Sequence, residues 1–362
     1  MSRKPEGALR RGWTTGACAT AATAAAYQAL LTGEFPDPVE IALPKGERPA
    51  FALARQELGE DSATAGIVKD AGDDPDVTHG ALVLSTVRRG AAGSGISFRA
   101  GIGIGTVTKP GLPIAVGEPA IHPAPRRMIA EAVLRVAAAF GGSADLEVTL
   151  SIPDGEEMAR HTWNPRLGIL GGLSILGTTG IVHPYSCAAW IASIHRGIDV
   201  CRANGVTHAA ACTGSVSEDG VKRLYDLPDI AFLDMGDFAG GTLKYLKAHP
   251  LPRLTIGGGF AKLAKLAAGS LDLHSGRSEL DRKAVAEWLA ALKAPPGLVA
   301  AAASANTGNE ILAEARKAGI PLADEVARRA RAVAAGIVEG KVAIEVVVFD
   351  REGALVGRAG FD

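Results

Sequence analysis

Short apolar segments alternate with helical stretches throughout the second half of the chain, from about residue 181. We predict strands there at Val206–Ala211, Ile230–Leu233, Leu254–Ile256, Leu298–Ala302 and Val342–Val348. The stretches between them, such as Asp281–Leu292, repeat apolar residues at the three- and four-residue spacing of an amphipathic helix, as does Pro184–Ala203 before them. Alternation of this kind predicts an α/β domain, in which a parallel-type sheet carries helices on both faces.

The first half of the chain follows a different pattern. An Ala-rich helix is predicted from about Thr14 to Leu31, with Gly33 as its stop. The apolar segments that follow succeed one another without helices between them: Val39–Leu43, Pro49–Glu57, Ala63–Val68, Ala81–Val87 and Ile96–Arg99. This pattern predicts an α+β domain with a mostly antiparallel sheet. A Gly-rich stretch over residues 164–184 is the expected hinge, and the domains are predicted to be 1–180 and 181–362.

Charge and composition limit the classes of partner. With 38 Lys and Arg against 39 Asp and Glu, the formal net charge is -1. We therefore expect no nucleic acid and no anionic membrane as partner. No apolar segment of signal-peptide type follows the basic start, and the longest apolar run, over residues 168–182, is too short and too rich in Gly to span a bilayer. A cytoplasmic protein is expected. The four Cys residues form no C-x-x-C pair, so no protein-bound metal is expected.

An acidic loop, Lys69–Gly80, separates two predicted strands of the first domain. It holds four Asp residues, Pro75 and His79. One interpretation is a solvated loop, since loops often carry charge without using it. The other is a rim of carboxylates beside a pocket that holds a cationic ligand, a metal or a proton. In the last case, Asp73, Asp74 and His79 are candidates for a general base.

The segment Gly101–Pro113 is rich in glycine but does not match a dinucleotide fingerprint. Its spacing is G-x-G-x-G, and Pro110-Gly111 follows where that motif requires a helix. It is either a backbone that a bulky ligand can approach, with Lys109 beside it, or a glycine-bearing strand with a bulge.

Two arginines stand where a helix disfavours them. Arg126 and Arg127 fall in the first turn of a helix predicted to run through Phe140, where they oppose the helix dipole. A bound anion would explain this placement. Thr14 and Thr15, at the start of the first helix, either cap it or leave its N–H groups open for an anion.

Small and polar residues follow the predicted strands of the second domain. The loops are Cys212–Ser215, Asp234–Gly241, Gly257–Phe260 and Ser304–Asn309. Ligands of parallel sheets bind at the carboxyl ends of the strands, so these loops predict a nucleotide-like or cofactor site. Its candidate residues are Thr213, Gly214, Asp234, Gly257, Gly258 and Gly259. Asp234 stands about twenty residues after the Thr213-Gly214 turn, where an acid commonly binds ribose hydroxyls.

Several long and unusual segments together resemble the CbiD family, the cobalt-precorrin-5B C1-methyltransferases. They are Thr14–Gly16 with Cys18-Ala19, Lys69–Thr78, Val107–Pro113, Pro119–Arg127, Asn164–Arg166, Gly177–Pro184 and Gly257–Lys262. The resemblance implies an α+β domain followed by an α/β domain. It also implies transfer of a methyl group from S-adenosylmethionine to carbon C1 of a contracted tetrapyrrole, giving cobalt-precorrin-6A, with cobalt carried by the substrate.

The residues can be assigned to that chemistry. Because the substrate carries many carboxylates, Lys109, Arg126, Arg127 and Arg166 are expected to bind it, together with Thr14 and Thr15. The S-adenosylmethionine side is expected in the second domain. A homo-oligomer and transient contact with neighbouring pathway enzymes are also expected. A metal-free substrate is an alternative to the cobalt-containing one. The alternative functions are a noncatalytic tetrapyrrole- or cobalt-binding scaffold and a small-metabolite kinase, although Gly101–Pro113 lacks the phosphate loop that a kinase requires.

Overall fold

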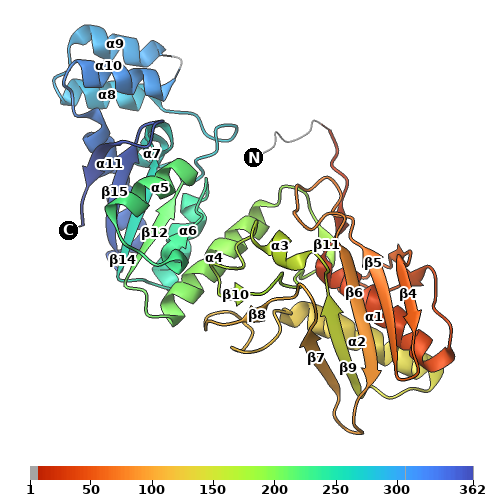
Figure 1. Cartoon of the computed structure of the whole chain (residues 1–362). Helices are drawn as coiled ribbons and strands as arrows, with labels where there is room; N and C mark the ends of the chain where they lie inside the picture. The colour runs from red at the N-terminus through yellow and green to blue at the C-terminus, as the bar shows by residue number, and fades with distance from the viewer. Residues whose placement is uncertain (1–6, 306, 362) are drawn as a thin grey trace. The chain divides into compact units, whose positions relative to one another are not determined.

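The computed structural model describes residues 7–305 and 307–361 (Figure 1). The chain divides into two compact units between Ser186 and Cys187. This division lies a few residues beyond the predicted boundary after residue 180. Each unit has its own hydrophobic core. None of the helices in the described part of the chain is long and apolar enough to cross a membrane.

The N-terminal unit is built on a five-stranded sheet of order β4-β5-β6-β9-β7. Its strands are β4 (Arg55–Leu58), β5 (Ser62–Val68), β6 (Leu82–Arg89), β9 (Leu146–Ser151) and β7 (Ile96–Ala100). All neighbours are antiparallel except β7 and β9, which run parallel. The predicted mostly antiparallel α+β architecture is therefore confirmed.

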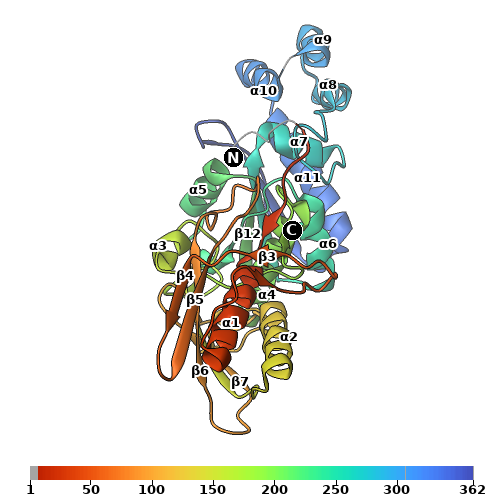
Figure 2. The ribbon, with the colours of Figure 1, turned by 90° about the vertical axis from the view of Figure 1, so that its right-hand side faces the viewer.

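Helices α1 (Thr15–Thr32) and α2 (Pro123–Phe140) lie side by side and pack together, with α1 directly against β5 and β6 (Figures 1 and 2). Nearly every residue of α1 is buried, because its alanines let the helix approach both the sheet and α2 closely. Gly33 ends α1 in the left-handed conformation, with φ of 83°, and donates its N–H to the carbonyl of Ala29. The predicted stop is confirmed.

Three short antiparallel pairs and one short helix complete this unit. The pairs are β1 (Gly12–Trp13) with β11 (Ile181–Val182), β2 (Val39–Glu40) with β3 (Ala50–Phe51), and β8 (Thr106–Val107) with β10 (Ile169–Leu170). The helix is α3 (Gly155–Ala159). The β1–β11 pair places residues 12–13, near the start of this unit, beside residues 181–182, near its end.

The C-terminal unit contains a five-stranded sheet of order β13-β12-β14-β15-β16. The first four strands run parallel: β13 (Phe232–Leu233), β12 (His208–Cys212), β14 (Arg253–Gly259) and β15 (Ala343–Phe349). The edge strand β16 (Leu355–Ala359), which the sequence pattern did not predict, is antiparallel to β15.

Helices cover both faces of this sheet, as predicted. Alternate residues of β12, β14 and β15 contribute to the large core, formed with α4 (Cys187–Ala203), α6 (Ala239–Ala248), α7 (Phe260–Ala267) and α11 (Leu322–Val338). The intervening residues of β12 and β15 form a smaller core with β13 and α5 (Ser215–Leu224). A short 3-10 helix, η1 (Asp229–Ala231), precedes β13.

The predicted strand at Leu298–Ala302 is wrong. These residues lie in helix α9 (Pro296–Ser304), which packs against α8 (Arg282–Ala291) and α10 (Gly308–Lys317). In the chain, these three helices come between α7 and α11. A short apolar run cannot be assigned to a strand or a buried helix by periodicity alone. Four consecutive alanines and a Pro at the first helical position favour the helix.

Candidate functional site

The carboxyl ends of β12 and β14 form the point at which the strand order of the C-terminal sheet reverses. From β12 the chain passes through α5 to β13 on one side, whereas β14 lies on the other side of β12. Ligands of such sheets bind at this point of reversal. Cys212 pairs in register with Gly257, and the N–H of Thr213 donates to the carbonyl of Gly257 at 2.9 Å. The structure therefore brings Thr213 and Gly214 next to the glycines of β14.

The four glycines at these strand ends serve two different purposes. A Cβ on Gly257 would lie 2.8 Å from Cγ2 of Val221, and one on Gly258 would lie 2.9 Å from Cγ of Leu263. These two glycines are required by internal packing. A Cβ on Gly214 or Gly259 would meet no heavy atom within 4 Å in the described part of the chain. Their backbone is therefore open to a ligand.

Asp234 lies at the end of β13, one strand from the reversal point. Its backbone carbonyl accepts a hydrogen bond from the indole Nε1 of Trp190 at 3.0 Å. The same loop is joined to β12 because the N–H of Gly236 donates to the carbonyl of Cys212 at 3.0 Å. The half-buried Asp234 thus borders the site formed by β12 and β14.

The fourth predicted strand-end loop, Ser304–Asn309, follows helix α9 and does not end a strand. That part of the prediction is wrong because the Leu298–Ala302 segment is helical, and residue 306 of the loop lies outside the described residues. The start of α10 nevertheless lies near the site: a Cβ on Gly308 would be 3.2 Å from Cβ of Ala261 in α7.

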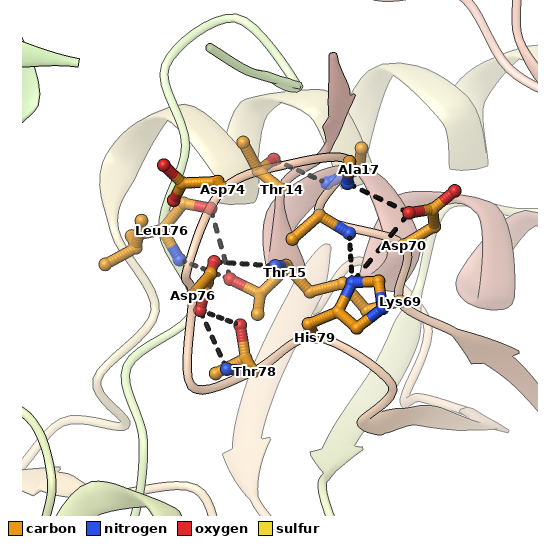
Figure 3. A network of polar contacts seen from close by, with 12 residues as sticks. Thr14, Thr15, Ala17, Lys69, Asp70, Asp74, Asp76, Thr78, His79 and Leu176 are labelled. Carbon is orange, nitrogen blue, oxygen red and sulfur yellow. Dashed lines mark hydrogen bonds and ion pairs between the residues drawn. The ribbon is translucent and has the colours of Figure 1, made fainter. Parts of the chain in front are cut away.

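The acidic loop of the N-terminal unit holds a buried ion pair (Figure 3). The side chain of Lys69 is only 1% exposed, and its Nζ lies 2.7 Å from Oδ2 of Asp76. Oδ1 of Asp76 accepts hydrogen bonds from the N–H and the hydroxyl of Thr78, both at 2.7 Å. Burial acts to raise the pKa of Asp76, but the Lys69 ammonium and the Thr78 donors lower it overall. This carboxylate therefore serves the loop itself.

Two further carboxylates fasten the loop to the N-terminal segment. Asp70 forms a bidentate ion pair with the guanidinium of Arg10, which together with the N–H of Gly72 lowers the pKa of Asp70 to about 2. Asp73 accepts the N–H of Arg10 at 2.6 Å. The two backbones are close enough that a Cβ on Gly12 would lie 2.0 Å from the carbonyl carbon of Ala71.

Asp74 and His79 differ in their capacity to accept a proton. Oδ1 of Asp74 accepts the N–H of Tyr185 at 2.7 Å, and burial raises the pKa of this carboxyl. No described residue donates to its Oδ2. His79 instead accepts the N–H of Ala71 through Nδ1 at 3.1 Å, so a neutral ring carries its proton on Nε2 and has no free acceptor. Of the three predicted bases, Asp74 is the best suited.

The hydroxyl groups of Thr14 and Thr15 both form hydrogen bonds with protein backbone groups. Oγ1 of Thr14 accepts the N–H of Ala17 at 3.1 Å, which is an N-cap. Oγ1 of Thr15 donates to the carbonyl of Leu176 at 3.2 Å and accepts its N–H at 3.1 Å (Figure 3). The N–H of Gly16 donates to the same carbonyl. The first turn of α1 therefore binds protein groups, which favours the capping interpretation.

The four predicted cations fall into two groups. Arg126 donates to the carbonyls of Ile121 and Pro119 and to Glu118, and Arg166 stacks over the ring of Trp163 at 4.9 Å. Arg127 is exposed and Lys109 is half-buried. Within residues 7–305 and 307–361, neither of these two charges has a hydrogen-bond or ion-pair partner. Lys109 and Arg127 are thus free to bind an anionic ligand.

The glycine-rich segment is a closely packed backbone structure. Gly103 has φ of 72°, and a Cβ on it would lie 1.9 Å from the carbonyl oxygen of Ile152. The N–H of Leu173 donates to the carbonyl of Gly103 at 2.8 Å, so the two glycine-rich segments lie side by side. Their glycines serve protein packing, but only Thr106–Val107 of this segment form a strand and the rest is mostly turns and single bridges, so the predicted bulged strand is not what these residues form. Large apolar side chains are exposed around them: Ile102 (75%), Val116 (56%), Leu170 (53%) and Leu176 (50%).

One charged pair at the candidate cofactor site was not among the residues predicted from the sequence. Nζ of Lys262, in the first turn of α7, lies 3.0 Å from Oδ1 of Asp237 and donates to the carbonyl of Thr213 at 2.8 Å. The signal was present as two opposite charges, one in the loop after β13 and one just after the glycines of β14.

A parallel-type sheet whose strand order reverses beside glycine backbone, with helices on both faces, defines the C-terminal unit as an α/β domain, which an α+β domain precedes. Residues 2–184 match the family model described as CbiD, and residues 272–360 match the one described as CbiD, C-terminal domain. The chain belongs to the CbiD family.

Close relatives share nearly the whole length. A protein of Paramagnetospirillum magneticum named cobalt-precorrin-5B C(1)-methyltransferase is 60% identical over 98% of this chain and 99% of its own. A protein of Brucella anthropi with the same name is 58% identical over 97% of this chain and 95% of its own. A crystal structure described as cobalamin biosynthesis protein (cbiD) from Archaeoglobus fulgidus is 30% identical, covers 75% of this chain and 84% of its own, and has a TM-score of 0.41.

Proposed function

We propose that this protein is an S-adenosylmethionine-dependent C-methyltransferase that converts cobalt-precorrin-5B into cobalt-precorrin-6A by methylating carbon C1. The observation that carries this proposal is the 58–60% identity, over nearly the full length, to relatives named for this reaction. The two-unit architecture supports it, since a polyanionic ring and a nucleoside-containing donor require chemically different sites.

The methyl donor is assigned to the carboxyl ends of β12 and β14. When bound there, S-adenosylmethionine supplies a methyl group activated by the positive sulfonium. Gly214 and Gly259 let the donor approach the backbone, because no side chain of the described residues fills the space beside them. Thr213 borders the same space, and Asp234 on the neighbouring strand end is suited to accept hydrogen bonds from ribose hydroxyls. Gly257 and Gly258 support the site indirectly, because they allow close packing against Val221 and Leu263.

The tetrapyrrole is assigned to the N-terminal unit. Its acetate and propionate groups require cations, which Lys109 and Arg127 offer because neither is paired within the described part of the chain. Its ring faces are apolar, and Ile102 and Leu170 present exposed apolar surface on the two adjacent glycine-rich segments. In this assignment Arg126, Arg166, Thr14 and Thr15 support the surface that holds the ring.

The chemistry asked of the protein is mainly alignment. Methyl transfer is an in-line displacement, so the enzyme has to hold the donor methyl and C1 close together and exclude water. Removal of a proton as C1 becomes nucleophilic is assigned to Asp74, whose Oδ2 is free to accept it. Asp73 and His79 support the loop that presents Asp74. Cobalt is part of the substrate in this scheme.

Three wider statements accompany the assignment as proposals: a cytoplasmic location, self-association, and transient contact with neighbouring enzymes of the pathway. Fractionation, light scattering and cross-linking would test them in turn.

The test is to incubate the protein with the tetrapyrrole and methyl-labelled S-adenosylmethionine, and to examine the macrocycle by mass spectrometry. We expect one labelled methyl group per ring. Running cobalt-containing and metal-free substrates side by side identifies the form that is used. Binding of the tetrapyrrole without any transfer of label would instead support the noncatalytic scaffold.

A further inference from the structure

We propose that Lys262 binds the carboxylate of the amino-acid part of the methyl donor, and that Asp237 positions it for this. The inference rests on the proposed donor site in the C-terminal unit and assigns one chemical group of the ligand to one side chain. The established family membership says nothing of this residue.

The position of Lys262 connects three strand ends. It stands in the first turn of α7, directly after β14. Its Nζ donates to the carbonyl of Thr213, after β12, at 2.8 Å, and lies 3.0 Å from Oδ1 of Asp237, in the loop after β13. The ammonium therefore lies at the reversal point of the sheet, beside the open backbone of Gly214 and Gly259.

The ammonium retains one donor for a ligand. A lysine carries three N–H donors. The carbonyl of Thr213 accepts one of them, and the carboxylate of Asp237 lies in ion-pair contact with the ammonium, so at least one donor is left; the Lys262 side chain is 38% exposed.

Asp237 pairs with the ammonium through a buried oxygen. Its Oδ1 is out of contact with solvent and accepts no hydrogen bond of good geometry from the described residues, so the ion pair with Lys262 is its main compensation. A second lysine, Lys265, lies one turn further along α7, with Nζ donating to the carbonyl of Leu273 at 3.1 Å. Two lysines beside one carboxylate favour an anion over a cation as a ligand of Lys262.

The donor has only one anionic group. Adenine and ribose are uncharged, and the sulfonium and the amino group are positive, so the methionine carboxylate is the group that an ammonium at this site can attract. Asp234, on the neighbouring strand end, remains suited to the ribose. The two assignments place the amino-acid part toward α7 and the nucleoside toward β13.

Calorimetry with two ligands separates this role from a structural one. S-adenosylhomocysteine carries the carboxylate, whereas 5′-methylthioadenosine lacks the whole amino-acid part. In the full-length Lys262→Met variant we expect the affinity for S-adenosylhomocysteine to fall about 10- to 100-fold, as for loss of a charge-assisted hydrogen bond. The affinity for 5′-methylthioadenosine should change less than about twofold. Lys262→Arg should retain part of the preference for S-adenosylhomocysteine over 5′-methylthioadenosine.

The matched control is Lys247→Met. This lysine also loses a carboxylate partner, Glu339 at 2.6 Å, but lies at the end of α6. We expect it to bind both ligands as the wild type does. An equal loss of both ligands in Lys262→Met would overturn the proposal, because it would show that Lys262 only holds the strand ends together.

A second measurement does not depend on the folding of a variant. The wild-type protein should bind S-adenosylmethionine at least about 10-fold more tightly than decarboxylated S-adenosylmethionine. Equal affinity would overturn the role of Lys262 while leaving the donor site intact. Failure of the wild type to bind any of these nucleosides would instead show that the proposed function is wrong.

Discussion

Arg358 holds a carboxylate that solvent does not reach. Its Nε lies 2.8 Å from Oε1 of Glu345, whose side chain is 0% exposed, at the amino end of the parallel sheet. Oε2 of Glu345 accepts hydrogen bonds from Tyr225 and Thr255. This network ties the antiparallel edge strand β16 to β15.

Arg358→Met should lower the free energy of unfolding by about 3–5 kcal/mol, because it leaves a buried charge unpaired. The double variant Glu345→Gln/Arg358→Met should recover part of that loss. Urea unfolding gives the comparison. The control Arg48→Met removes an exposed pair, in which 69% of the Arg side chain and 52% of the Glu40 side chain are accessible, and should cost no more than about 1 kcal/mol. A loss in Arg358→Met as small as that of the control would contradict the account.

Asp74→Asn should reduce kcat about 100-fold or more, since the loss of a positioned base typically costs that much. Because burial raises the pKa of Asp74, its carboxylate becomes protonated, and activity falls, at a higher pH than for an ordinary Asp. The wild-type profile of kcat/KM against pH should show this acidic limb, and the variant should lack it. Asp73→Asn is the control, because Asp73 accepts the N–H of Arg10. An unchanged limb in Asp74→Asn would remove Asp74 as the base.

Asp70 should make stability depend on pH below about 4. Its folded pKa, lowered to about 2 by hydrogen bonds from Arg10 and Gly72, lies under its unfolded value. The stabilising contribution is therefore complete above the unfolded pKa and disappears as pH falls through the folded pKa. The difference in unfolding free energy between wild type and Asp70→Asn should shrink from about pH 4 toward pH 2. A difference for Asp70→Asn that stays constant over this pH range would count against this ion pair.

Lys109→Met and Arg127→Met should each raise KM for the tetrapyrrole about tenfold and leave the melting temperature unchanged. Neither charge is paired within the described residues, so its removal disturbs only ligand binding. Arg135→Met, on the exposed side of the same helix as Arg127, is the control. If both variants kept the wild-type KM, the ring would have to bind elsewhere.

Much of the fold could be predicted from the spacing of apolar residues and from the residues that begin and end helices and strands. The alternation of apolar segments predicted the parallel sheet, and Thr14 and Gly33 marked the ends of α1 correctly. Leu298–Ala302 failed because an Ala-rich apolar run carries no period that separates a buried helix from a strand. The edge strand β16 was missed because Leu355–Ala359 is short and interrupted by Gly357.

The roles within the site were harder to predict, because they depend on partners distant in sequence. The sequence shows the acidic loop as a cluster of charge. It does not show that Lys69 is buried against Asp76, or that Arg10 forms an ion pair with Asp70. Likewise, the helix-start position of Arg126 suggested a ligand, whereas its actual partners are the carbonyls of Ile121 and Pro119 and the carboxylate of Glu118.

The central claim is that the methyl donor binds the carboxyl ends of β12 and β14. Hydrogen–deuterium exchange with and without S-adenosylhomocysteine tests it most directly, because it reports which amides the ligand protects. We expect protection to concentrate in the segments that contain Thr213–Ser215 and Gly257–Lys262. Protection confined to the N-terminal unit, with these segments unchanged, would contradict the account.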